Sequence, residues 1–107
     1  DAIQQVLFNL MINSIHAIEN KGKIEINLDE VVVKGQHYAE LSVSDNGHGI
    51  EGDTSKLFEP FYSTKSSGSG LGLAISKQII EKHGGWIEVE SLLNEGTTFR
   101  LFLPIIE

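Results

Sequence analysis

Three short segments of this sequence combine residue types that could hold a charged or polar ligand. In the first segment, Asn9 and Asn13 are four residues apart in a stretch of helical periodicity, and His16 continues their stripe. An amide carbonyl is a hard oxygen ligand for Mg²⁺, which keeps waters and substrate phosphates in its other positions. Because asparagine is only a moderate helix former, the alternative is a polar face that points to solvent.

The second segment is Asp45-Asn-Gly-His-Gly-Ile50, which follows directly after a predicted strand. Asn-Gly is a strong turn signal, so a simple hairpin turn is one interpretation. However, strand alternation does not resume after Ile50, which indicates that the turn leads into a loop. A carboxylate fixed at a strand end can accept a hydrogen bond from an exocyclic amine. Gly47 and Gly49 would let a flat heterocycle lie close to the backbone.

The third segment, Gly68-Ser-Gly-Leu-Gly-Leu-Ala-Ile75, runs straight into a predicted helix. Glycine-rich backbone before a helix directs unpaired N–H groups and the positive end of the helix dipole toward an anion. The segment is neither a Rossmann fingerprint nor a Walker A loop, because it lacks a parallel βαβ unit and a Gly-Lys-Ser/Thr ending. A flexible Ser/Gly link is the alternative interpretation.

A phenylalanine-rich stretch lies between the second and third segments. Phe58 and Phe61 are expected to pack on the domain and tether the long loop, which could also act as a lid that orders over a ligand. Lys65 could reach a phosphate, although an exposed lysine is more often only solvated.

The elements that must position these segments follow from periodicity. A 3.6-residue apolar stripe predicts a helix from Asp1 to about Glu19, through residues that include Leu10, Met11 and Ile15. Strands are predicted over Lys23–Leu28, with Val31–Val33 as a possible continuation, and then over Tyr38–Ser44, Trp86–Glu90 and Thr98–Leu103. One helical turn is predicted near Ser55–Phe58, and a second helix over Gly70–His83 that ends at Gly84. This order predicts an α+β fold: a two-layer sandwich of a mixed, mostly antiparallel sheet with its helices on one face.

Composition narrows the class of protein. The chain has 107 residues, which is enough for one domain, and a net charge of −7, which argues against nucleic acid or anionic membrane as a main partner. It has no cysteine, which excludes disulfides and zinc–thiolate sites. The sequence shows no membrane-spanning run and no leader, and we expect a cytoplasmic domain.

Each segment is ambiguous alone, but their order resembles the ATP-binding catalytic domains of sensor histidine kinases. The helix with two asparagines, Asp-x-Gly-x-Gly, the phenylalanine-rich loop, Gly-x-Gly-x-Gly-Leu and the final Glu-Gly-Thr-Thr-Phe resemble that family's N box, F box and three glycine boxes. The resemblance covers Ile3 to Pro104. It implies the Bergerat fold, a sandwich with ATP bound between its helices and a mobile lid.

The resemblance also assigns roles to residues. It implies that Asp45 accepts a hydrogen bond from the adenine amino group and that Asn13 is the Mg²⁺ ligand, with Asn9 beside it in the same catalytic box. Contacts with the nucleotide are implied for Asn9, Asn13, His16, Ala17, Asp45, Gly47, Gly49, Ile50, Phe58, Lys65, Gly68, Ser69, Gly70, Leu71, Gly72, Leu73 and Thr98. Many members have lysine or arginine where His16 stands here.

The family's histidine-bearing motif does not occur in this sequence. The resemblance therefore implies a single catalytic domain over residues 1–107 that starts at the N-box helix, without the family's usual first strand. This domain would bind Mg-ATP and donate the γ-phosphate to a histidine on a separate dimerisation domain of the same protein. A response regulator would act downstream in the two-component phosphorelay, and the domain would make no direct membrane contact even where its parent protein is membrane-anchored.

Three other functions fit parts of the pattern. ATP-hydrolysing relatives of the gyrase, Hsp90 or MutL kind resemble this fold but use a glutamate where Asn9 stands, and an amide offers no basicity for activating water. Kinases that resemble the mitochondrial dehydrogenase kinases or the anti-sigma-factor kinases share the boxes. A binding module with a decayed pocket is disfavoured because every box is intact.

Overall fold

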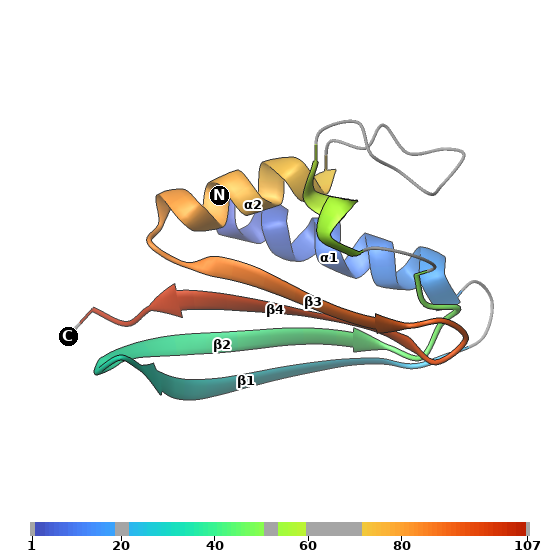
Figure 1. Cartoon of the computed structure of the whole chain (residues 1–107), viewed down its shortest axis with the longest axis horizontal. Helices are drawn as coiled ribbons and strands as arrows, with labels where there is room; N and C mark the ends of the chain where they lie inside the picture. The colour runs from blue at the N-terminus through green and yellow to red at the C-terminus, as the bar shows by residue number, and fades with distance from the viewer. Residues whose placement is uncertain (1, 19–21, 51–53, 60–71, 107) are drawn as a thin grey trace.

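The molecule consists of one sheet with its helices along one face (Figure 1). The computed structural model describes residues 2–18, 22–50, 54–59 and 72–106. Its elements are, in order, α1 (Ala2–Ile18), β1 (Ile24–Val33), β2 (Gln36–Asp45), the 3₁₀ helix η1 (Thr54–Phe58), α2 (Gly72–Lys82), β3 (Trp86–Leu92) and β4 (Gly96–Pro104). This arrangement confirms the two-layer α+β sandwich predicted from the sequence.

The sheet has the strand order β1-β2-β4-β3. The three strand pairings among the described residues are antiparallel. The central pairing joins β2 to β4 and sets Asp45 opposite Thr97. Segments from the middle and the end of the chain therefore meet at one end of the sheet.

The first hairpin is longer than the sequence indicated. β1 and β2 are paired without a break from Ile24–Asp45 to Val33–Gln36. The turn between them places Lys34 and Gly35 at positive φ, 51° and 80°, the conformation that two-residue hairpin turns require. Asp29 and Glu30 interrupt the apolar alternation without ending the strand, because both side chains are exposed on an edge strand.

The core lies between the helices and the sheet. Its buried cluster consists of Val6 and Leu10 from α1, Ile80 from α2, Val43 from β2, and Phe99 and Leu101 from β4. Alternate residues of β2 and β4 thus point toward the helices, as period-2 patterning predicts. Phe58 of η1 packs against this cluster, with its ring 6.4 Å from that of Phe99. The expected packing of Phe58 on the domain is confirmed.

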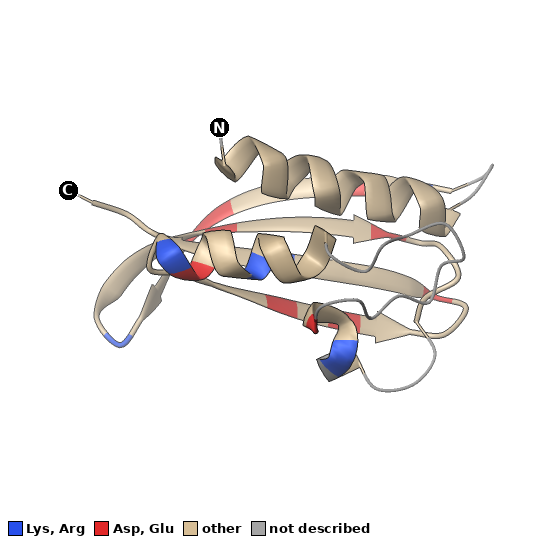
Figure 2. Cartoon of the chain, turned by 90° about the horizontal axis from the view of Figure 1, so that it is seen from above, with Lys and Arg blue, Asp and Glu red and all other residues tan. Residues whose placement is uncertain are grey.

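The solvent side of α1 differs from the expectation. Met11 and Ile15 belong to the apolar stripe that predicted the helix, yet they are 40% and 46% exposed, and Phe8 is 60% exposed. The helix carries no Lys, Arg, Asp or Glu (Figure 2). Periodicity identified the helix correctly but assigned it a wider buried face than the sheet covers. Within the described residues, no helix combines the length and the hydropathy that crossing a bilayer needs.

The C-terminus of α2 follows the prediction. Gly84 has φ of 84°, and its N–H donates to the Glu81 carbonyl while that of Gly85 donates to the Ile80 carbonyl. These two bonds form a Schellman motif with Gly84 at the C′ position. His83 Nδ1 lies 2.7 Å from the Ile79 carbonyl oxygen, so its side chain caps the last turn.

Candidate functional site

Asp45 stands at the end of β2 and is 8% exposed. Its position alternates with Val43, so its side chain is on the face of the sheet that the helices cover. The carboxylate Oδ1 accepts a hydrogen bond of 2.9 Å from the Gly47 N–H. This is the local Asx geometry that the turn interpretation predicted, and it holds the carboxylate in place at the start of the loop.

The loop after Asp45 is attached to the last turn of α1 and to the β3–β4 turn. The His48 N–H donates to the Ala17 carbonyl at 3.2 Å, and the His48 carbonyl accepts from the Asn94 N–H at 2.6 Å. Asn46 Oδ1 accepts from the Lys23 N–H at 2.7 Å. The loop therefore bridges two parts of the chain that are remote in sequence.

The glycines of this loop serve protein packing. A Cβ on Gly47 would collide with the Ala17 carbonyl, and one on Gly49 with the Leu92 carbonyl. Gly49 also has φ of 73°, which few other residues adopt. The sequence suggested that these glycines leave room for a flat ligand, but in the structure the space is filled by backbone of α1 and β3.

The asparagine stripe of α1 faces the start of α2. Asn9 Nδ2 lies 3.4 Å from the Gly72 carbonyl oxygen and 3.3 Å from Ser76 Oγ. Asn13 Nδ2 donates to the Asn9 carbonyl at 3.0 Å. Asn9 therefore lies against the first described turn of α2, and Asn13 is bonded to Asn9 one turn further along α1.

Helix α1 thus lies beside two different chemical environments. Near Asn9 is the N-terminal end of α2, where N–H groups and the helix dipole favour an anion. Near Ala17 is the loop that carries the Asp45 carboxylate. From Asn9 to Ala17 the helix advances about 12 Å. An elongated ligand with a hydrogen-bond donor at one end and an anionic group at the other matches this arrangement.

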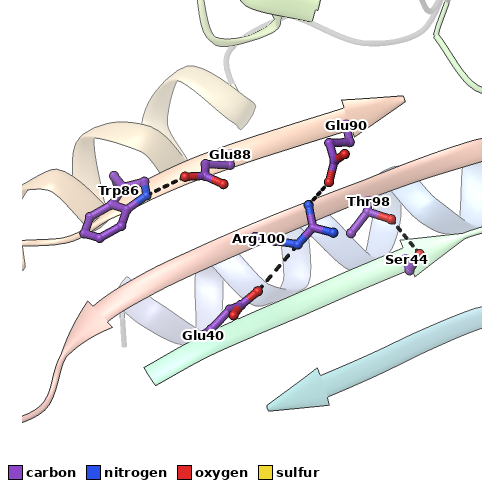
Figure 3. Close-up of polar contacts among 7 residues, drawn as sticks. All are labelled: Glu40, Ser44, Trp86, Glu88, Glu90, Thr98 and Arg100. Atoms are coloured by element: carbon purple, nitrogen blue, oxygen red, sulfur yellow. Dashed lines mark hydrogen bonds and ion pairs between the residues drawn. The ribbon is translucent and has the colours of Figure 1, made fainter. Parts of the chain in front are cut away.

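Thr98 does not share this site. Its Oγ1 lies 2.7 Å from Ser44 Oγ, on the face of the sheet that the helices leave uncovered (Figure 3). On the same face, Arg100 forms ion pairs with Glu40 and Glu90, and the Trp86 indole donates to Glu88 (Figure 3). The sequence analysis chose Thr98, but Thr98 and Asp45 are on opposite faces of the sheet.

Thr97 is the threonine beside Asp45. It is 5% exposed and is paired across the sheet with Asp45. Its Oγ1 is 2.9 Å from Ser91 Oγ, which also accepts the Ile50 N–H at 2.8 Å. Sequence reasoning missed Thr97 and Ser91, although alternation with the buried Phe99 would have placed Thr97 inward. Through this network, Ile50 of the loop is fixed to β3 and β4.

Other predicted residues vary in how they are placed. His16 is exposed near the end of α1, and Leu73 packs against the core from α2. Phe58, another predicted residue, has the Lys77 ammonium 5.8 Å from the centre of its ring. Phe61, Lys65, Gly68, Ser69, Gly70 and Leu71 lie outside the described residues.

Asn13 could contribute one ligand to a magnesium ion that is also coordinated by phosphate oxygens. With Nδ2 directed to the Asn9 carbonyl, the side chain would ligate through Oδ1, the hard oxygen that Mg²⁺ prefers. The described residues contain no group of three or more His, Cys, Asp or Glu that could hold a metal by themselves. This donor set suits an ion bound by one protein oxygen together with phosphates and waters.

Comparison with known proteins identifies relatives over the whole chain. The sequence model of the family described as histidine kinase-, DNA gyrase B- and HSP90-like ATPase matches residues 1–107. The chain is 42% identical over 107 residues to the sensor histidine kinase ZraS of Salmonella typhimurium, covering 99% of this chain and 22% of that protein. It is 45% identical over 106 residues to the histidine-protein kinase AtoS of Escherichia coli, covering 98% and 17%. The chain thus spans about a fifth of the length of these relatives.

Solved structures agree with this result. The mycobacterial sensor histidine kinase MprB superposes with a TM-score of 0.82 at 30% identity, covering 96% of this chain and 70% of that chain. The catalytic domain of histidine kinase ThkA, in a nucleotide-free form, superposes with a TM-score of 0.81 at 39% identity, covering 96% and 66%.

Proposed function

The chain belongs to the family of histidine kinase-, DNA gyrase B- and HSP90-like ATPases, and we propose that it is the catalytic domain of a sensor histidine kinase. In this role it binds Mg-ATP and donates the γ-phosphate to a histidine on a separate dimerisation domain. The observation that carries the proposal is that α1 contacts both the loop after Asp45, through the Ala17 carbonyl, and the start of α2, through Asn9. The similarity to named sensor histidine kinases supports the choice within the family.

Each of these two contact regions of α1 would bind one end of ATP. Asp45 accepts a hydrogen bond from the adenine amino group, an interaction that a 6-oxo purine cannot supply. The N–H groups at the start of α2 bind the phosphates. Mg²⁺, held by Asn13 and the phosphates, would supply positive charge against the oxygens of the transferred group.

Phosphate transfer requires an acceptor from elsewhere. A neutral imidazole nitrogen attacks the γ-phosphorus, a P–N bond forms, and the bond from phosphorus to the β,γ-bridging oxygen breaks, so that ADP leaves with the electron pair. None of the four histidines of this chain stands in the acceptor context of the family. The acceptor, a downstream response regulator and a cytoplasmic location therefore belong to the proposal for the whole protein.

Hydrolysis of ATP is the less favoured activity. The family members that hydrolyse ATP resemble this chain but use a glutamate one turn before the magnesium-binding asparagine. Here that position is Asn9, whose amide is directed to the Gly72 carbonyl and Ser76. A neutral amide cannot remove a proton from water, so this arrangement favours transfer to a histidine.

The Asp45→Asn variant tests the proposal. The substitution keeps the size of the side chain but replaces one acceptor oxygen by a donor NH₂. We expect ATP affinity to fall by at least the ~1.5–3 kcal/mol typical of a hydrogen bond to a charged group, measured by calorimetric titration. With ATP labelled in the γ-phosphate and the histidine-bearing domain of the parent kinase added, wild type should label that domain and the variant should not. Unchanged ATP affinity would remove Asp45 from this role.

A further inference from the structure

Ser76 is a fully buried polar residue of α2. It is 0% exposed and belongs, with Ala74 and Ile80, to the buried residues of that helix. Helix α2 packs beside α1 (Figure 1), and Ser76 meets a polar side chain there, because Asn9 Nδ2 lies 3.3 Å from Ser76 Oγ. Burying a hydroxyl beside an amide costs free energy unless their hydrogen bonds are made. This polar pair in a helix contact therefore needs an explanation beyond packing.

Ser76 and Asn9 share a partner, the carbonyl of Gly72. The Ser76 hydroxyl donates to this oxygen at 2.8 Å, and Asn9 Nδ2 lies 3.4 Å from it. A serine within a helix often bonds to the carbonyl one turn earlier, but here a second donor arrives from another helix. The peptide unit that contains the Gly72 carbonyl is therefore held by α1 as well as by α2.

The same peptide unit contains the N–H of Leu73. A trans peptide unit is planar, so its carbonyl and its N–H point in opposite directions. Leu73 is in the first turn of α2, where N–H groups have no acceptor within the helix. Because linked hydrogen bonds polarise one another, donors at the Gly72 carbonyl also make the Leu73 N–H a stronger donor. Ser76 and Asn9 therefore act on a donor at the end of α2 to which phosphate binding is assigned above.

We propose that Ser76 is a positioning residue for phosphate binding: with Asn9, it orients the Gly72–Leu73 peptide unit so that the Leu73 N–H donates to a phosphate oxygen of the nucleotide. This inference rests on the proposed function and adds to it a buried residue that does not itself touch the ligand. It also links the phosphate end of the site to α1, because the Asn9 amide contacts the same carbonyl.

The Ser76→Ala variant of the ¹⁵N-labelled chain tests this role. Alanine removes the hydroxyl but is the better helix former, so the melting temperature of the ligand-free chain should change little. ATP affinity in the presence of Mg²⁺, measured by calorimetric titration, should fall about three- to tenfold, the loss expected for one hydrogen bond. At saturation with ATP, the amide proton of Leu73 should move downfield in wild type and should move clearly less far in the variant.

Ser44→Ala is the matched control. It also removes a hydroxyl that lies within hydrogen-bond distance of a described side chain, that of Thr98 at 2.7 Å, but on the face of the sheet that the helices leave uncovered. Its ATP affinity and its Leu73 shift should equal those of wild type.

The outcomes distinguish this inference from the proposed function. If wild type binds ATP and Ser76→Ala binds it equally well, Ser76 contributes only to packing and the proposed function stands. A lower affinity with an unchanged Leu73 shift would also overturn the inference, because the loss would then arise elsewhere in the site. So would a Leu73 amide proton that does not move downfield in wild type. Absence of ATP binding by wild type would overturn both.

Discussion

At the scale of residues, Asn9 and Asn13 have the same side chain but different surroundings. The Asn9 amide connects α1 to α2 through the Gly72 carbonyl and Ser76, so it contributes to helix packing. The Asn13 amide donates to the carbonyl of Asn9 within its own helix. We therefore expect substitution of Asn9 to affect stability as well as binding.

Asn13→Ala tests the assignment of the magnesium ligand. Loss of Oδ1 should weaken ATP binding in the presence of Mg²⁺ and leave binding in EDTA nearly unchanged, because only the ion depends on that oxygen. Titrations of wild type and variant, each with and without Mg²⁺, measure the difference. Equal losses under both conditions would contradict the assignment.

Thr97 and Thr98 form a matched pair of neighbours on opposite faces of β4. Thr97→Val removes the hydroxyl bonded to Ser91 on the face of Asp45, whereas Thr98→Val removes the hydroxyl bonded to Ser44 on the other face. Each should lower the free energy of unfolding by about 1 kcal/mol, the net value of one hydrogen bond. Only Thr97→Val should also weaken ATP binding in a calorimetric titration. If Thr98→Val weakened ATP binding more than Thr97→Val, the face of the sheet on which a threonine lies would not determine whether it contributes to ATP binding.

At the scale of elements, the loop after β2 is held by close backbone contacts. Its attachments are the end of α1, through Ala17, and the β3–β4 turn, through Asn94. Gly49 is at the closest of these approaches, because its α-carbon faces the Leu92 carbonyl. Because the loop is anchored on both sides, it can fix the position of the carboxylate at its start. A hairpin turn without such attachments would not fix it.

Gly49→Ala and Gly35→Ala separate strain from collision. Both glycines have positive φ, 73° and 80°, so alanine at either position should destabilise the chain by about 1–2 kcal/mol. A Cβ on Gly35 meets nothing within 4 Å, whereas one on Gly49 collides with the Leu92 carbonyl. We expect Gly49→Ala to be clearly the more destabilising in denaturant unfolding and to weaken ATP binding. Equal destabilisation by the two substitutions would mean that the loop can move away from the Leu92 carbonyl at no cost in free energy.

At the scale of the whole molecule, local patterns predicted the elements and their order but not how far each extends or which face each residue occupies. The helices, the hairpins, the Gly84 cap and the placement of helices on one face followed from periodicity and turn chemistry. The pairing of β2 with β4 is set by packing of segments far apart in sequence, so the meeting of Asp45 and Thr97 was not predictable from local patterns. The same limit explains the choice of Thr98 and the exposure of Met11.

The site shows the same division. Asp45, Asn9 and Asn13 could be proposed from residue type and spacing because their chemistry is unusual where they stand. Thr97 and Ser91 could not, because a hydroxyl side chain carries no signal until its burial and partners are known.

Calorimetric titration of the chain with ATP, and with GTP as the control, in the presence of Mg²⁺ tests the central claim most directly. We expect saturable binding of ATP and much weaker binding of GTP, because the proposed Asp45 carboxylate acceptor would accept a hydrogen bond from a 6-amino group and would repel a 6-oxo group. Equal affinity for both nucleotides would contradict the role of Asp45 in base recognition. Absence of binding to either would contradict the proposal that this chain is a nucleotide-binding catalytic domain.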